Sequence, residues 1–370
     1  MKKRYLFLLL FYLITSNTQA QAPTKTWNEL GLKIAKALNN HDESVDQYFD
    51  KMAFLNRFIA PNPRNKDIKK FNRDIRSQWR RFSLGNSLAK QPTLFNYEYI
   101  EMHEDSSLVI RQWEVGEGLN YLLFKLDYIN DTWIAVDLYV MMTGEFLSET
   151  MRNTIYLPTV IRLIQGGKKS RQGMSNAEIY IEASKLMQKE EYQRAYTKIS
   201  GIPLKERLKA HQILKLNLSY YLDSNEKILK AIEEYQTRFP NDPSFEFIML
   251  DKYFLEEKYE KVLTAITTIE AFIGADDYLH YQKGLVYHLM GDLKMSEAKM
   301  REAIQIRPSE ELYYWELLTI LEWQKSYAKC VKVLKTVQEK FSYSKANLRE
   351  KTLEGYNVFP YTRKFRRWAK

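Results

Sequence analysis

A repeat of 34 residues runs through positions 245–341 of this 370-residue chain and constrains its fold more than any other feature. A period of 34 is typical of a helix-turn-helix array, in which every copy supplies two antiparallel helices and packs only against its neighbours. The matching columns are Tyr253, Tyr287 and Leu321; Tyr259, Leu293 and Tyr327; Val262, Ser296 and Cys330; Ile266, Met300 and Leu334; and Ile269, Ala303 and Val337.

The clearest copy of the repeat occupies residues 281–308. Its diagnostic residues are Gly284, Tyr287, Gly291, Asp292, Leu293, Ser296, Met300, Ala303 and Pro308. This pattern resembles the tetratricopeptide repeat (TPR) family. The resemblance implies an all-α solenoid of about five repeats over residues 175–342, closed by a capping helix over residues 343–358. Because such arrays bind many unrelated proteins, it does not name a partner.

The first residues have the composition of an export signal. Three cations at positions 2–4 precede an apolar run over residues 5–14, and cleavage is expected after Ala20 or, as the less favoured site, after Ala22. The apolar run has about half the length that a membrane span needs. We therefore expect residues 1–20 to be a signal peptide, with an uncleaved anchor as the alternative.

The cysteine content and the charge distribution restrict the cellular location and the classes of partner that we expect. The one cysteine, Cys330, sits where the repeat requires a small buried residue, so we expect no internal disulfide and no lipid-modified cysteine after the signal. The formal charge of +10 falls to +7 without the signal peptide, and residues 360–370 hold five of the remaining cations and no acid. Because the basic character is local, we expect no nucleic-acid surface. These features favour a periplasmic or secreted protein.

Before the repeats, the apolar spacing changes from helical to alternating. Residues 27–39, 45–59 and 66–82 have helical spacing, and prolines end the second segment. A period of two then predicts strands at residues 95–103, 108–114, 119–128 and 132–140, with a tight hairpin turn at Asn130 and Asp131, and a further helix is expected at residues 145–164.

Helices followed by an antiparallel meander predict an α+β domain over residues 23–165. The order of its elements is similar to that of nuclear-transport-factor-2-like or cystatin-like domains. Residues 166–174 are polar and rich in glycine, as in a flexible linker. The expected fold class is thus an α+β N-terminal domain followed by an all-α solenoid, with a basic aromatic tail at residues 359–370.

Catalytic patterns are scarce. The sequence has no glycine-rich phosphate loop, no His-Glu-x-x-His pair and no Gly-x-Ser-x-Gly elbow, and its five histidines lack metal-ligand spacing. We therefore expect no enzyme activity, no metal and no cofactor.

One face of the predicted sheet mixes acids, bases and aromatic residues, as a small-molecule pocket does. Its members are Arg111, Trp113, Lys125, Asp127, Asp137 and Tyr139. The alternative is that these residues lie on a partly solvated sheet face.

The TPR resemblance implies a second surface, a concave groove lined by the first helix of each repeat. Aromatic residues are frequent at the matching positions and would suit an extended peptide or a partner helix with apolar anchors. The positions are Tyr180, Met187, Phe247, Asp251, Phe254, Tyr278, Tyr281, His288, Trp315, Glu322 and Trp323. The alternative for each is packing against a neighbouring repeat. The carboxylate clamp of the family's chaperone-tail binders has no counterpart here.

The tail interleaves four aromatic residues with its five cations. Such a segment suits a weak contact with an anionic membrane surface, and a disordered, solvated terminus is the alternative.

These features predict an exported, non-enzymatic adaptor that binds a protein or peptide partner in the cell envelope through the groove of its repeats. The alternative hypothesis is a small-ligand-binding or weakly catalytic α+β domain, for which the repeats serve assembly.

Overall fold

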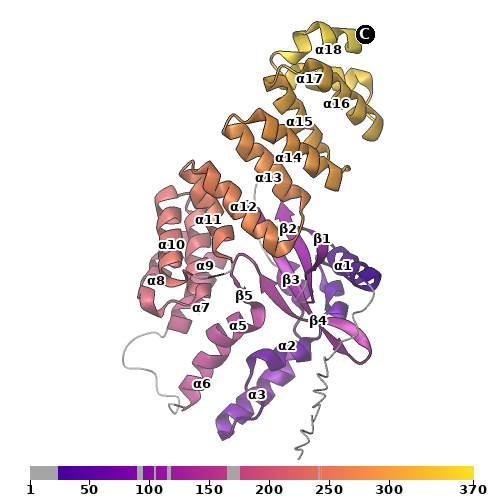
Figure 1. Ribbon diagram of the computed structural model, residues 1–370. Helices are drawn as coiled ribbons and strands as arrows, with labels where there is room; N and C mark the ends of the chain where they lie inside the picture. The colour runs from indigo at the N-terminus through magenta and orange to yellow at the C-terminus, as the bar shows by residue number, and fades with distance from the viewer. Residues whose placement is uncertain are drawn as a thin grey trace, which may run out of the picture.

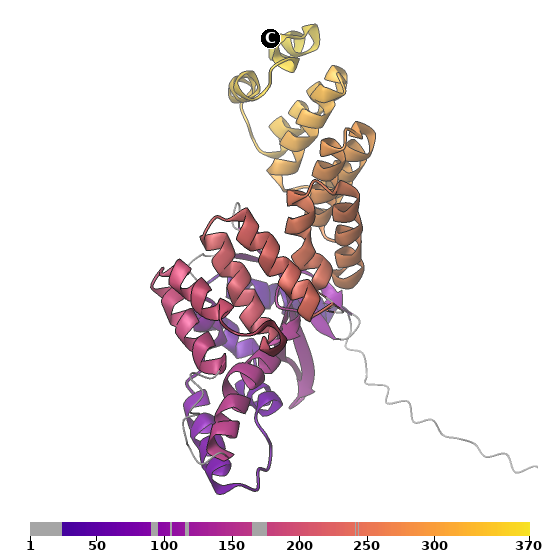
Figure 2. The ribbon, with the colours of Figure 1, turned by 90° about the vertical axis from the view of Figure 1, so that its left-hand side faces the viewer.

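The computed structural model describes residues 24–89, 95–103, 106–114, 118–164, 176–240, 242 and 244–370. As predicted, these residues form a helix-and-sheet region followed by an array of helical hairpins (Figure 1). The first half of the array lies beside the sheet, and the second half extends away from it (Figures 1 and 2). The predicted signal peptide (residues 1–20) and linker (residues 166–174) lie outside the described residues.

Five helical elements precede the sheet, and side-chain caps fix the starts of several of them. Asp50 and Asn65 each accept hydrogen bonds from the first N–H groups of the helix that follows. The segment predicted as one helix at residues 45–59 is two elements, because Phe49 is extended and bridges to Ala135 of the sheet. The five elements are α1 (Thr24–Leu38), the 3-10 helix η1 (Glu43–Tyr48), α2 (Lys51–Phe58), α3 (Lys66–Trp79) and α4 (Leu84–Ala89).

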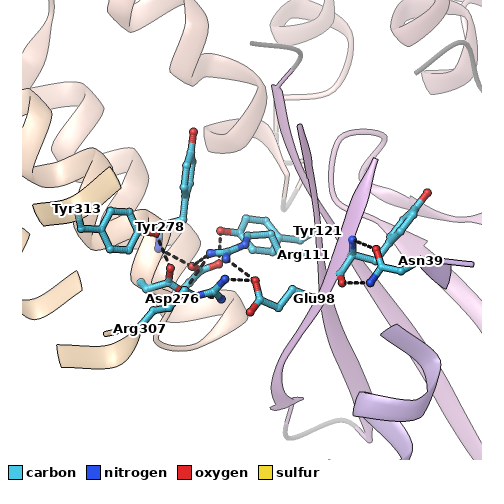
Figure 3. Close-up of polar contacts among 10 residues, drawn as sticks. Asn39, Glu98, Arg111, Tyr121, Asp276, Tyr278, Arg307 and Tyr313 are labelled. Carbon is cyan, nitrogen blue, oxygen red and sulfur yellow. Dashed lines mark hydrogen bonds and ion pairs between the residues drawn. The ribbon is translucent and has the colours of Figure 1, made fainter. Parts of the chain in front are cut away.

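The sheet is an antiparallel meander with its strands in chain order. Asn130 and Asp131 have φ values of 49° and 60°, which confirms the predicted tight turn between the two longest strands. At the opposite edge the side-chain amide of Asn39 donates to the Tyr97 carbonyl (2.7 Å) and accepts from the Tyr97 N–H (2.9 Å) (Figure 3). This side chain thus takes the place that the backbone of a neighbouring strand would have beside the edge strand. The strands are β1 (Asn96–His103), β2 (Ser107–Glu114), β3 (Gly118–Ile129), β4 (Thr132–Val140) and β5 (Glu145–Phe146).

Both faces of the sheet are apolar, and different parts of the chain cover them. One face packs Ile110, Leu122 and Phe124 against Ile34 of α1 and Phe54 of α2. The other face is covered by helices of the array, and its buried residues are Val109, Tyr121, Leu123, Tyr139 and Met141. The sheet is therefore the middle layer of the molecule rather than one wall of a separate domain.

The chain leaves the sheet through the helix predicted at residues 145–164. Its first two residues pair with β4 as strand β5, and the helical part begins at Leu147. The helical elements are α5 (Leu147–Met151), a π-helical turn η2 (Arg152–Tyr156) and α6 (Leu157–Ile164).

The array consists of helix pairs whose spacing confirms the 34-residue period. The second helix of successive pairs begins at Tyr192, Asn225, Tyr259, Leu293 and Tyr327, steps of 33 or 34 residues. The elements are α7 (Asn176–Gln188), α8 (Tyr192–Ser200), η3 (Leu204–Glu206), α9 (Lys209–Tyr221), α10 (Asn225–Arg238), α11 (Phe245–Leu255), α12 (Tyr259–Ile273), α13 (Asp277–Leu289), α14 (Leu293–Ile306), α15 (Glu311–Trp323) and α16 (Tyr327–Lys340).

The turn inside each pair repeats one geometry. One residue with positive φ lies two positions after the last residue of each first helix: Glu190 (60°), Asp223 (46°), Glu257 (54°), Gly291 (80°) and Lys325 (57°). After Glu257, Gly291 and Lys325, the next N–H group donates back across the turn to a carbonyl of the first helix, at 2.9 Å in each case, and the acceptors Tyr253, Tyr287 and Leu321 form one of the sequence columns. The repeat in the sequence thus reflects a repeated helix cap.

The last elements close the open end of the array. They are α17 (Lys345–Gly355), the 3-10 turn η4 (Phe359–Tyr361) and α18 (Arg363–Ala369). The prediction of a separate basic tail at residues 359–370 is wrong, because Phe359, Phe365 and Trp368 are buried in the core of the last repeat. The predicted cap therefore extends to the end of the chain, and the five cations of residues 360–370 are exposed.

Candidate functional site

A buried ion network joins the sheet to the array at α13. Arg111 of β2 pairs with Asp276 and Asp277, which precede and begin that helix, and with Glu98 of β1 at 2.7 Å (Figure 3). Arg307 adds a second cation, 3.0 Å from the Asp277 carboxylate. Because the Arg111 side chain is only 2% exposed, this cation is a link between two layers and is shielded from ligands.

Two tyrosines complete the network from opposite sides. The Tyr121 hydroxyl of β3 donates to Asp276 (2.8 Å), and the Tyr313 hydroxyl of α15 donates to Asp277 (2.5 Å) (Figure 3). Burial raises the pKa of the Asp276 carboxyl, and the Arg111 charge opposes that rise. The Asp276 carboxyl is thus surrounded by protein partners, and Arg111 and Tyr121 contact its two oxygen atoms.

The sheet-face pocket predicted from the sequence is wrong for Arg111 and Tyr139. Tyr139 is 8% exposed, and its hydroxyl is 2.8 Å from the Ser244 hydroxyl beside α11. Both side chains are occupied by partners from the array, because the array covers this face of the sheet.

The other predicted pocket residues do not converge on Arg111 either. Asp127 and Asp137 share Arg57 of α2, at 3.1 and 4.0 Å, and the buried Asp137 also accepts a hydrogen bond from the Ser148 hydroxyl (2.6 Å). Trp113 and Lys125 are half-buried. The six predicted pocket residues therefore lie in separate structural contacts and do not form one pocket.

Four of the predicted groove residues are occupied by contacts outside the repeats. Phe247 and Tyr278 face the sheet, with ring centroids 6.1 Å apart for Phe247 and Tyr121 and the Arg111 guanidinium 5.7 Å from the Tyr278 ring. The C-terminal cap covers the other two: the Tyr356 hydroxyl donates to the Trp315 carbonyl (3.0 Å), and the N–H groups of residues 358 and 359 donate to Glu322 (2.8 and 2.6 Å).

Five further groove residues pack within the array. Tyr281 stacks on Tyr313 at 5.2 Å, the Tyr180 ring lies 5.5 Å from His211, and the Tyr220 hydroxyl donates to Asp251. Met187 and Phe254 are half-buried. These five residues therefore pack between repeats, which was the alternative to lining a binding groove.

The open part of the array is a row of apolar side chains at the ends of the first helices. Tyr221, Leu255, Leu289 and Trp323 are each the last residue of such a helix and lie 34 residues apart. Their exposed fractions are 45, 44, 59 and 66%. Because the hairpins stack in chain order, this apolar ridge follows one edge of the array.

Residues beside the apolar ridge extend it. Tyr220 and Met290 are 41 and 37% exposed, and the His288 ring packs edge-on to Trp323 at 5.8 Å. Tyr221 stacks on Tyr192 at 4.6 Å, so the first member of the ridge is held in place.

Sequence reasoning found Trp323 and His288 but missed the other members of the ridge. The available signal was the position before each turn, since Tyr221, Leu255 and Leu289 repeat at the same 34-residue step as the columns. An apolar residue there cannot pack inward, because the helix ends and reverses after it.

Repeated helix pairs, a shared capped turn and small buried residues such as Ala303 and Cys330 now identify the array. The C-terminal half is an α-solenoid of helical hairpins, and its repeated features resemble those of TPR arrays. No protein-family model matches the chain, and no curated protein matches it.

Solved structures that are similar to part of this chain, all at low identity, include the following three. MamA is 17% identical over 49% of this chain and 95% of its own, with a TM-score of 0.37. MamA from Desulfovibrio magneticus RS-1 is 15% identical, covering 46 and 97%, with a TM-score of 0.40. PilW, a type IV pilus biogenesis factor, is 12% identical, covering 54 and 100%, with a TM-score of 0.36.

Proposed function

We propose that this protein is an exported, non-enzymatic adaptor that binds a protein partner in the cell envelope along the apolar ridge of its TPR solenoid. The observation that carries the proposal is the ridge itself, because four exposed apolar side chains recur on one edge of four successive repeats. Two of them are Tyr and Trp, and Trp and Tyr dominate the binding energy of protein interfaces. The partner that fits is a helix or extended segment with regularly spaced apolar residues.

Export is part of the proposal and rests on the signal-peptide pattern of residues 1–20. No helix in the described part of the chain has the length and apolar character to cross a membrane. The exposed cations of α18 would add a weak, salt-sensitive attraction to an anionic membrane surface. Phe359, Phe365 and Trp368 would not insert into the membrane, because these side chains are buried in the protein.

The test is crosslinking from the ridge in intact cells. A photoreactive residue at position 289 should capture the partner, and Leu289→Ser together with Trp323→Ser should lower its recovery on the affinity-purified protein by about tenfold or more. The control is Ile306→Ser, which removes a 45%-exposed apolar side chain at the opposite edge of the stack, where α14 ends.

Substitutions in the ridge are expected to leave folding intact, since both side chains are largely exposed. In contrast, Tyr281→Ala or Trp315→Ala would disturb packing contacts and cannot separate binding from stability. Equal recovery with the ridge variant and with Ile306→Ser would refute the proposal.

A further inference from the structure

A concave surface lies on α3, a helix at the end of the molecule opposite the C-terminus (Figure 1). The loop at residues 61–64 and one face of α3 enclose a pocket of about 360 Å³. Lys69, Arg73 and Arg76 line it from the helix, at spacings of four and three residues that place them on one face, and Asn72 lies next to Arg73.

The lining of this pocket carries charge of one sign. Arg64 of the loop joins Lys69, Arg73 and Arg76, and the described lining contains no acidic side chain. Within the described part of the chain, none of these four cations forms an ion pair, whereas Arg57, Arg111 and Arg207 all do. Four unpaired cations around one concavity concentrate a positive potential there, which attracts an anion.

The walls of the pocket are held in place before any ligand binds. Pro61 and Pro63 restrict the loop backbone. Ala60, at the base of the loop, accepts a hydrogen bond from Asn72 of α3 (2.8 Å) and donates one to the Tyr156 hydroxyl (2.9 Å). An anion entering the pocket would therefore meet cations on an ordered frame, with little entropy lost on binding.

Asn72 gives a second, independent indication of a ligand. The residue is 6% exposed and lines the pocket, and its Oδ1 atom has no hydrogen-bond partner in the described residues. Its Nδ2 donates to Ala60, which fixes Oδ1 as the acceptor end of the amide. A buried acceptor without a donor is costly, and a ligand hydroxyl beside the anionic group would supply the donor.

We propose that this pocket binds the phosphate group of a hydroxyl-bearing phosphorylated ligand. Three of the four cations are arginines, whose forked guanidinium groups match phosphate oxygens better than a point charge does. A volume of about 360 Å³ is within the range of small-ligand sites and exceeds the needs of a bare anion. The phosphate belongs either to a soluble organic phosphate or to a lipid headgroup.

The experiment measures binding of three probes to the full chain at low ionic strength. Inorganic phosphate and glucose 6-phosphate are titrated by calorimetry, and vesicles of phosphatidylcholine with phosphatidylglycerol, whose headgroup carries a phosphate and free hydroxyls, are tested by co-sedimentation. Arg73→Ala with Arg76→Ala should weaken binding by about tenfold or more, because two charge-assisted contacts are lost.

The matched control is Lys66→Ala with Lys70→Ala, which removes the same charge from exposed positions of α3 outside the pocket lining. It should change the affinity by less than about threefold, since only long-range attraction is altered. Saturable glucose 6-phosphate binding supports a soluble ligand, and binding to vesicles alone supports a headgroup. Equal weakening by both double variants, or no saturable binding of any probe, would overturn the proposal.

Discussion

At the scale of single residues, Arg111 joins the sheet to the array through buried ion pairs. It is the only cation of the described residues within ion-pair distance of Asp276, a carboxylate that is itself 1% exposed. We expect Arg111→Met to lower the free energy of unfolding by about 3–5 kcal/mol, because a buried charge is left without its counter-charge. Urea denaturation at neutral pH measures this loss.

The same substitution should carry a pH signature. Burial raises the pKa of Asp276, so the folded protein binds this proton more readily than the unfolded chain, and falling pH favours folding through this group. Without Arg111 the pKa should rise further, and the stability gap between Arg111→Met and the wild type should narrow between pH 7 and pH 5. Arg162→Met, which removes a surface ion pair with Glu178 (2.9 Å), should cost less than about 1 kcal/mol at both pH values. A gap that is constant with pH would contradict this account.

At the scale of elements, the capped turn of the hairpins is the repeated unit. Gly291 has a φ of 80°, and a Cβ atom added to it would meet no atom within 4 Å. Gly291→Ala should therefore cost about 1 kcal/mol from backbone strain alone. Lys325→Gly, at the equivalent turn one repeat later, should be neutral or stabilise by up to about 1 kcal/mol, because a non-glycine residue there already bears the strain. Thermal unfolding of both variants checks the pair, and a loss of stability in both would exclude this explanation.

Elements with a local cause could be predicted from the sequence. The 34-residue columns located α11 to α16, because the same turn and the same small buried residues recur in each copy. Asn130 and Asp131 located the hairpin, because these residues tolerate positive φ. The folding of the tail could not be read in this way, since the burial of Phe365 and Trp368 depends on the last repeat offering an open face.

At the scale of the whole molecule, the α+β region and the solenoid share one apolar core. Val262, Ile266, Ile269 and Ile273 of α12 are at most 1% exposed and belong to the same cluster as Tyr121 and Leu123 of the sheet. An isolated fragment of residues 176–370 would expose this surface to water. We expect it to unfold at a lower temperature than the full chain and to self-associate, as measured by calorimetry and analytical ultracentrifugation. A monomeric fragment as stable as the full chain would show that the two parts fold independently.

This shared core explains why the pocket on the sheet could not be predicted correctly. Arg111 and Asp276 are 165 residues apart in the chain, and alternation along β2 and β3 shows that both faces carry apolar residues without showing what covers the second one. A sheet face that carries both polar and apolar residues is interpreted as solvated when the helices that cover it are distant in the sequence. The groove of the repeats was mispredicted for the same reason. Phe247 and Trp315 match the groove positions of the repeat, but the sheet covers Phe247 and the C-terminal cap covers Trp315.

The attachment of the sheet at α11 to α13 also restricts how the number of repeats can change during evolution. A copy gained or lost after α16 would alter only the length of the free arm, provided that the C-terminal cap moves with it. A copy inserted between α9 and α13 would displace Asp276 and Asp277 from Arg111 by a whole hairpin and would break the buried network. Duplication and deletion of repeats are therefore expected to be confined to the C-terminal arm in descendants of this architecture.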